Sequence, residues 1–200
     1  MDKVLSQLGG RICLFDGAMG TTLQAMGLQP GELPELWSLT HREDLAGIHR
    51  SYLQAGADFL KTNTFGANRV KLEGTGHSVD EVVFAGVRNA QQAVIECGHG
   101  LVFLDIGPTG KLLRPLGELD FEDAVSVFGE MVHAGVMAGA DAILIETMSD
   151  IYEAKAALLA AKEYSDLPVF VTMTFDQDGK LLTGGSIEVA VAVLEGLGAD

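Results

Sequence analysis

The sequence predicts an α/β fold in which a parallel sheet is built from successive strand–helix units. Apolar runs of strand length alternate with segments of helical periodicity, and the alternation occurs five times. The trailing ends of these runs carry carboxylate, amide or hydroxyl side chains, whereas the leading ends carry tight-turn residues. In parallel α/β folds the functional site lies at the carboxyl ends of the strands. The polar side chains at the trailing ends of the apolar runs therefore indicate where the functional site lies.

Five strands are expected, and each is followed by a helix. The first ends at Asp-Gly, and the fourth is a continuous apolar run typical of a strand covered on both faces. The expected strands are Arg11–Asp16, Asp58–Thr64, Leu101–Ile106, Ala142–Glu146 and Val169–Phe175.

Capping residues and apolar spacing place the helices. Ser78 and Glu81 form a capping-box pattern, and Asp120 is a plausible N-cap. A short helix and a turn ending at Gly9-Gly10 are expected before the first strand, and residues 27–40 are expected to form an ordered surface excursion. The other expected helices cover about 21–26, 43–55, 79–97, 121–138, 150–164 and 186–197.

The triplet Gly-Ala-Asp occurs at residues 56–58, 139–141 and 198–200, each time where a predicted helix ends. After the first two triplets a strand begins, so the same rule predicts a sixth strand after Asp200. Five strands do not close a barrel. We therefore expect the first five units of a larger (β/α)8 TIM barrel in a single domain. An open, doubly wound sheet is the alternative.

Composition excludes several functional classes. The 200 residues are 48% hydrophobic and carry a formal net charge of −15, which argues against nucleic acid or an anionic membrane as a partner. No signal peptide and no apolar run of about 20 residues is present, so a cytoplasmic location is expected. Cys13 and Cys97 are too few for a disulfide framework, and no histidine has metal-ligand spacing.

Asp16 and Glu146 are the strongest candidates for functional-site residues. Each ends an apolar strand, where an unpaired carboxylate is costly, and Lys61 or a substrate ammonium group would compensate it. Asp16 also fits a turn-forming aspartate before glycine, and Glu146 fits a rim ion pair or a cap. Asp105 and Asn63 are further candidates. Thr62, Thr64 and Thr109 are more typical of backbone caps.

Five motifs in register resemble the homocysteine S-methyltransferase family. They are Asp16-Gly-Ala-Met-Gly-Thr21, Thr62-Asn-Thr-Phe-Gly-Ala-Asn68, Asp105-Ile-Gly-Pro-Thr-Gly110, Glu146-Thr-Met-Ser-Asp150 and Met173-Thr-Phe-Asp176. Within that family, Asn63-Thr-Phe-Gly66 resembles the cobalamin-dependent, methionine-forming branch more than the S-methylmethionine-using branch.

The resemblance implies a (β/α)8 barrel that binds homocysteine beside zinc held by three cysteine thiolates, with methylcobalamin as the methyl donor. The zinc cysteines are expected beyond Asp200, and the cobalamin and methyltetrahydrofolate sites on other domains. Asp16 and Glu146 are expected to hold the substrate ammonium, and the Gly17–Gly20 backbone to place the substrate. The expected substrate-binding residues are Asp16, Gly17, Ala18, Met19, Gly20, Asn63, Thr64, Asp105, Glu146 and Thr147.

Two other functions remain open from the sequence. A non-catalytic binding or assembly module would keep the ligand pocket without the metal. Another barrel enzyme, such as an aldolase, would need a Schiff-base lysine at a strand end, and Lys61 is a weak candidate for that role.

Overall fold

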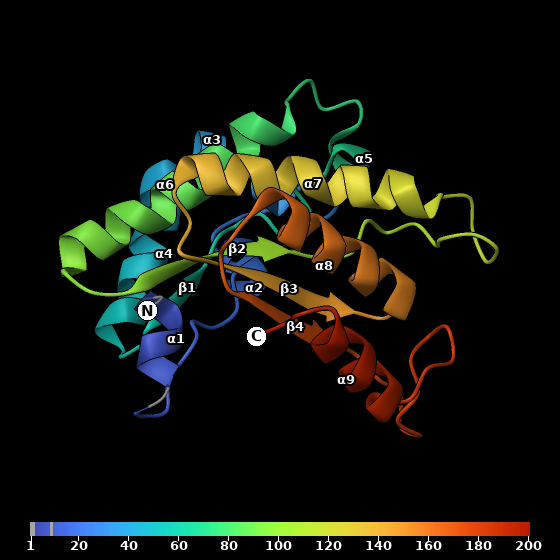
Figure 1. The fold of residues 1–200 in the computed structure, drawn as a ribbon. Helices are drawn as coiled ribbons and strands as arrows, with labels where there is room; N and C mark the ends of the chain where they lie inside the picture. Colours follow the sequence, from blue (N-terminus) through green and yellow to red (C-terminus); the bar gives the residue numbers. More distant parts are fainter. Residues whose placement is uncertain (1–2, 9) are drawn as a thin grey trace.

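The computed structural model describes residues 3–8 and 10–200, and its centre is a sheet of four parallel strands. The strands are β1 (Phe59–Lys61), β2 (Leu101–Ile106), β3 (Ala142–Met148) and β4 (Val169–Met173), and they lie side by side in chain order (Figure 1). Each consecutive pair is parallel, with Leu60 opposite Val102 and Leu104 opposite Ile143. The α/β class and the parallel sheet are thus confirmed.

The segment expected as a first strand, residues 11–16, is not a strand in the structure, so that prediction was wrong. It makes a single parallel bridge, between Phe15 and Phe59, at the free edge of β1. Its side chains are poorly covered, with Ile12 85% and Leu14 56% exposed. A segment that pairs on one side and packs on little else does not form a continuous ladder. The expected turn at Gly9-Gly10 falls partly on Gly9, which lies outside the described residues.

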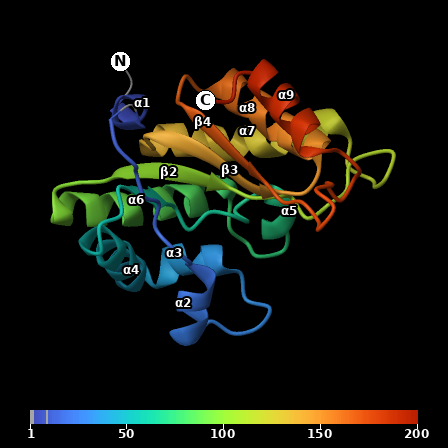
Figure 2. The ribbon, with the colours of Figure 1, turned by 90° about the horizontal axis from the view of Figure 1, so that it is seen from below.

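The helices cover one face of the sheet in an arc, as Figures 1 and 2 show. In order along the arc, α4 (Arg42–Gln54), α6 (Val79–Cys97), α7 (Phe121–Ala138), α8 (Ile151–Tyr164) and α9 (Ile187–Gly196) each pack on the next. Shorter elements precede or connect them: α1 (Lys3–Leu8), α2 (Gly20–Ala25), η1 (Pro34–Leu36), α3 (Trp37–Thr40) and α5 (Arg69–Leu72).

Side chains of alternate strand residues divide between two cores. Leu60, Val102 and Leu104 point toward the helices, whereas Phe59 and Phe103 point to the opposite face. On that face they pack with Val4 of α1, near the leading ends of the strands. Because β2 is buried along its whole length on both faces, its sequence is a continuous apolar run apart from Asp105.

Local signals explain the helix boundaries. The Ser78 hydroxyl accepts the Glu81 N–H, and the Glu81 carboxylate accepts the Ser78 N–H, so the predicted capping box is confirmed. Gly98 then ends α6 in the left-handed conformation. Asp120 occupies the N-cap position of α7, but its side chain makes no capping bond and pairs instead with Arg114 at 2.9 Å.

The three Gly-Ala-Asp triplets make the same contact. Asp141 donates its N–H to the Val102 carbonyl and accepts the Val102 N–H on its carboxylate, both at 2.8 Å. Asp58 exchanges the same two bonds with Leu14, and Asp200 with Val169. Each aspartate therefore ties the end of a helical unit to the residue it contacts, and Asp141 in this way fixes the start of β3 relative to β2.

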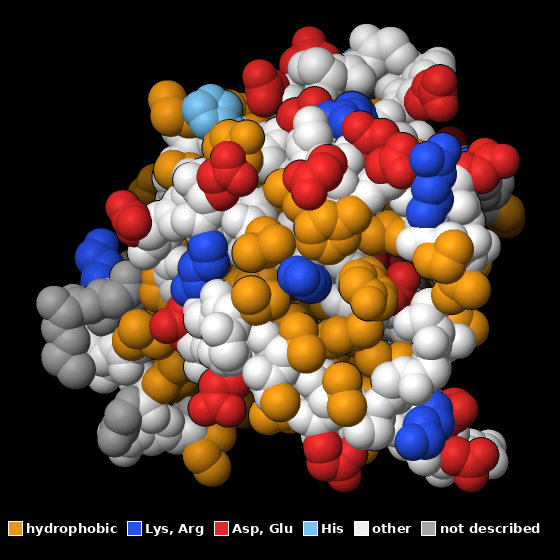
Figure 3. All heavy atoms as spheres, turned by 45° about the vertical axis from the view of Figure 1, so that its right-hand side comes forward, with side chains coloured by type: hydrophobic (Ala, Val, Ile, Leu, Met, Phe, Trp, Pro, Cys, Tyr) orange, Lys and Arg blue, Asp and Glu red, His pale blue; other side chains and the backbone are white. Residues whose placement is uncertain are grey.

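Several large apolar side chains are exposed in the C-terminal part of the chain. On α8, the loop after β4, and α9, Tyr152 is 62%, Leu182 73% and Val191 57% exposed. Figure 3 brings the side of the molecule with the first turns of α7 and α8 forward, and hydrophobic side chains lie across its middle. Within the described part of the chain, no helix is both long and apolar enough to cross a membrane.

Candidate active site

A cavity of about 400 Å3, here called the strand-end cavity, lies at the carboxyl ends of β1, β2 and β3. This volume is within the range of small-molecule sites. Of the ten residues predicted to bind substrate, nine line it; the exception, Thr64, is fully buried behind it. The lining residues that were predicted are Asp16, Gly17, Ala18, Met19, Gly20, Asn63, Asp105, Glu146 and Thr147.

Asp16 is held at the mouth by backbone bonds at the edge of β1. Its N–H donates to the Phe59 carbonyl at 2.9 Å, and its Oδ2 accepts the Lys61 N–H at 3.1 Å. Its Oδ1 is buried and has no hydrogen-bond partner among the described residues. Burial raises the pKa of Asp16 to about 7. The carboxyl is therefore poised to exchange a proton near neutral pH.

Asp105, on β2, is fixed through two threonine hydroxyls of the neighbouring segment. The Asp105 N–H donates to Thr62 Oγ1, and Thr64 Oγ1 donates to the Asp105 carbonyl. The hydroxyls lie 2.6 Å apart, so Thr62 donates to Thr64. These threonines bind backbone, as their residue type predicted. Asp105 Oδ1 has no partner in the described part of the chain, and burial, then the Glu146 charge, raises the pKa of Asp105.

Glu146 reaches the cavity through an irregularity in β3. The register between β3 and β4 shifts between Ile145 and Met148, and Thr147 has φ +61°, which is rare for a β-branched residue. Thr172 Oγ1 accepts the Thr147 N–H at 2.9 Å and holds this backbone in place. The predicted end of this strand at Glu146 was wrong, because β3 continues to Met148.

Lys61 forms an ion pair with Glu146 across the mouth. Its Nζ lies 3.2 Å and 3.4 Å from the two carboxylate oxygens. Burial lowers the pKa of Lys61, but Glu146, Asp105 and Asp16 together outweigh that effect and leave it raised. A lysine held in its charged form is a poor Schiff-base nucleophile. The aldolase alternative therefore loses its one candidate residue.

The loop of residues 17–20 forms another wall and depends on glycine. A Cβ on Gly17 would lie 2.8 Å from the Tyr52 ring, so only glycine fits without displacing it. The Tyr52 hydroxyl donates to the Ala18 carbonyl at 2.9 Å and ties the loop to α4. The backbone of this loop therefore lies against the cavity in a fixed position.

Part of the expected surface excursion, residues 27–40, closes the mouth, and its role was missed. Pro34 and Glu35 line the cavity. Glu35 is 5% exposed; its Oε1 accepts the Gly66 N–H, and its Oε2 is buried with no partner among the residues described. The Asn63 amide donates to the Pro34 carbonyl at 2.7 Å and holds this segment. No sequence pattern around Glu35 indicates this burial, because glutamate is normally an exposed residue.

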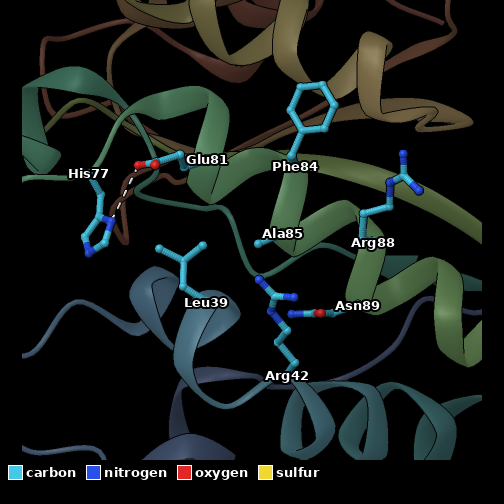
Figure 4. Close-up of a pocket in the computed structure, with 8 residues that line it drawn as sticks. All are labelled: Leu39, Arg42, His77, Glu81, Phe84, Ala85, Arg88 and Asn89. Carbon is cyan, nitrogen blue, oxygen red and sulfur yellow. Dashed lines mark ion pairs between the residues drawn. The ribbon is translucent and has the colours of Figure 1, made fainter.

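A second cavity, of about 440 Å3, lies between α3, α4 and α6 (Figure 4). Arg42 and Arg88 flank it, and His77 pairs with Glu81 at 3.5 Å. Of its lining residues, none has a buried polar atom lacking a partner in the described structure. It therefore lacks the buried carboxylate oxygens without hydrogen-bond partners among the described residues that distinguish the strand-end cavity.

The described residues contain no group of three or more His, Cys, Asp or Glu side chains arranged to hold a metal ion. Cys13 lies beside the Gln7 carbonyl and Cys97 in the last turn of α6, and neither lines the strand-end cavity. The donor set for a thiolate-bound zinc is therefore not supplied by the residues described.

Comparison with known proteins agrees with this architecture. Two methionine synthases, from Mycobacterium tuberculosis and Mycobacterium leprae, are each 32% identical over 98% of this chain. The chain spans only 18% of the length of either relative.

Solved structures show the same fold. The oxidized form of the homocysteine methyltransferase MmuM from Escherichia coli matches with a TM-score of 0.85 and 24% identity, over 98% of this chain and 74% of that one. Its metallated form matches with a TM-score of 0.82, over 96% of this chain. The family model for homocysteine S-methyltransferase matches residues 13–199. Fold, motifs and family model agree, and the chain belongs to the homocysteine S-methyltransferase family.

Proposed function

We propose that the strand-end cavity binds homocysteine, and that this chain is the substrate-binding part of a homocysteine S-methyltransferase of the methionine synthase type. One observation carries the proposal. Asp16 Oδ1, Asp105 Oδ1 and Glu35 Oε2 are buried carboxylate oxygens without partners among the residues described, and all three residues line this cavity. Buried polar groups are normally paired, so three unmet acceptors in one cavity mark a site for a cationic donor. The ammonium group of an amino acid supplies such donors.

The unmet oxygens favour Asp16 and Asp105 as the direct ammonium ligands. Both oxygens of Glu146 already contact Lys61 in the ligand-free site. The predicted pairing of the ammonium with Asp16 and Glu146 therefore requires Lys61 to move, whereas Asp16 Oδ1 and Asp105 Oδ1 have no partner among the described residues that must be displaced. The backbone of residues 17–20 places the substrate from the adjoining wall.

The sheet belongs, in this proposal, to a (β/α)8 barrel whose first units this chain supplies. The parallel strand order supports it, and so does the likeness to MmuM, of which the chain covers 74%. The repeated aspartate contact gives further support, because Asp200 binds Val169 as Asp141 binds Val102. A parallel strand placed after Asp200 would pair with the free edge of β4.

Zinc and cobalamin enter the proposal only through the family. In that reading zinc lowers the pKa of the homocysteine thiol, and methylcobalamin carries the methyl group. Since the described residues do not fit a thiolate zinc site, no step is assigned to a metal here. What these residues do is bind and orient the amino acid. A module that binds homocysteine without methyl transfer would use the same contacts.

Calorimetric titration of L-homocysteine into the purified chain, under reducing conditions, tests the proposal. We expect saturable binding that Asp16→Asn and Asp105→Asn each weaken by roughly 10- to 100-fold, as expected for losing a charge-assisted bond. Asp178→Asn, an exposed change in the loop after β4, is the matched control and should leave the affinity unchanged. Absence of binding, or equal affinity in all three variants, would overturn the proposal.

A further inference from the structure

Lys61 is the single lysine or arginine that lines the strand-end cavity in the described structure. Four carboxylates, those of Asp16, Glu35, Asp105 and Glu146, line the same space. The proposed function explains the acidic groups as ligands of the substrate ammonium, but it assigns no role to Lys61. A cation in a site for a cationic group lowers the affinity for that group unless it contributes something else.

Lys61 is held in place both through its backbone and through its side-chain ammonium group. Its backbone N–H donates to Asp16 Oδ2 at 3.1 Å, and its Nζ contacts both oxygens of Glu146. Its side chain is 24% exposed, far less than a lysine that extends into solvent. An ammonium group has three donors, and within the described structure the hydrogen bonds of Nζ all go to one carboxylate. Nζ therefore keeps donor capacity at the cavity wall.

We propose that Lys61 binds the α-carboxylate of the substrate amino acid, and that Glu146 is a positioning residue that holds Lys61 in place. This inference rests on the proposed function, because it assigns the second charged group of the same ligand. An amino acid is a zwitterion, so a site that recognises it needs acceptors for the ammonium and donors for the carboxylate. Asp16 and Asp105 supply the acceptors, and among the described residues that line the cavity Lys61 is the one cationic side chain able to donate.

The assignment makes Lys61 a specificity determinant. Without it, a cavity lined only by carboxylates would repel the substrate carboxylate and accept simple amines at least as well. With it, an amine that lacks the carboxylate leaves the Lys61 donors unused. The competing role for Lys61 is that of a counter-ion which merely neutralises Glu146. In that role its removal would strengthen the binding of every ammonium ligand.

The two roles are separated by two ligands and three variants. L-Homocysteine carries both charged groups, and 3-aminopropane-1-thiol keeps the ammonium and the thiol but lacks the carboxylate. Binding of each to the full chain is measured by calorimetry under reducing conditions, for Lys61→Met, Lys61→Arg and Glu146→Gln. Lys111→Met, at an exposed lysine outside the cavity, is the matched control. Circular dichroism verifies that each variant is folded.

We expect Lys61→Met to weaken homocysteine binding by roughly 10- to 100-fold while 3-aminopropane-1-thiol binds equally well or more tightly. Lys61→Arg should retain most of the homocysteine affinity, and Glu146→Gln should lose part of it, again without loss for the amine. Unchanged or tighter homocysteine binding in Lys61→Met, or equal loss for both ligands, would overturn the role of Lys61 alone. No homocysteine binding by the unchanged chain would overturn the proposed function, and this inference with it.

Discussion

The buried ring of His49 lies beside the carboxylate of Asp16, with 3.9 Å between Nδ1 and Oδ2. This distance is too long for a hydrogen bond, and both ring nitrogens lack partners among the residues described. Burial lowers the pKa of His49 to about 4, so the ring is neutral at pH 7. The pair is therefore not an ion pair at neutral pH, and Asp16 keeps its raised pKa of about 7.

Homocysteine affinity should rise with pH through about 7. The ammonium of the ligand favours the ionised form of Asp16, and below pH 7 the protonated carboxyl must first lose a proton. Binding at pH 6 should therefore release protons, which calorimetry in buffers of different ionisation enthalpy measures. Asp16→Asn should bind weakly and with less proton release. A flat profile with no released proton would contradict the role of Asp16.

The stability of the protein should fall in mild acid because of His49. Its pKa is lower in the folded protein than in the unfolded chain, so its contribution is complete above about pH 6.5 and is lost as the pH falls toward 4. The loss should reach roughly 3 kcal/mol for this fully buried ring. Urea unfolding of wild type and His49→Leu at pH 7 and pH 4.5 measures it. If both lose stability equally, His49 is not the acid-sensitive group.

Replacement of Asp141 by alanine should destabilise the protein. The change leaves the buried Val102 N–H without its acceptor, which costs about 1–3 kcal/mol. Asp141→Asn keeps an acceptor oxygen and should lose less. The exposed change Asp178→Ala should lie within about 0.5 kcal/mol of wild type. A change in urea midpoint for Asp141→Ala no larger than for this control would refute the register role of the triplet.

Two helical glycines should respond oppositely to alanine. A Cβ on Gly135 of α7 would lie 2.5 Å from Leu104 Cδ2 in the buried core, so overpacking should destabilise by roughly 1–3 kcal/mol. A Cβ on Gly47 of α4 would meet only Arg50, at 3.6 Å, so Gly47→Ala should stabilise by about 0.5–1 kcal/mol. Thermal unfolding of both variants compares them. A Gly135→Ala variant that is as stable as wild type or more stable would show that α7 does not pack on β2 as described.

The sequence was most informative where local and tertiary signals coincide. Strand β2 has the predicted bounds, because a residue run buried on both faces is apolar throughout. The start of α6 follows from its capping box, which is a local interaction. Residues 11–16 failed as a strand because pairing at a sheet edge depends on neighbours that the local sequence does not reveal.

The site was predictable only in part for the same reason. Asp105 and Glu146 converge because parallel strands place their carboxyl ends together, and the bridge between Phe15 and Phe59 brings Asp16 beside them. The ion pair between Lys61 and Glu146 agrees with the expectation that Lys61 compensates a strand-end carboxylate. It joins β1 and β3, which are separated by β2, so no sequence spacing selects Glu146 over Asp16 as the partner. Glu35 enters the cavity from a connection far from any strand end, and the turned backbone at Thr147 is set by the β3–β4 register.

A crystal structure of the chain soaked with L-homocysteine tests the central claim most directly. We expect the ligand in the strand-end cavity, with its ammonium within hydrogen-bonding distance of Asp16 Oδ1 and Asp105 Oδ1. Homocysteine found instead in the cavity beside Arg42 and Arg88, or an empty strand-end cavity at saturating ligand, would contradict the account.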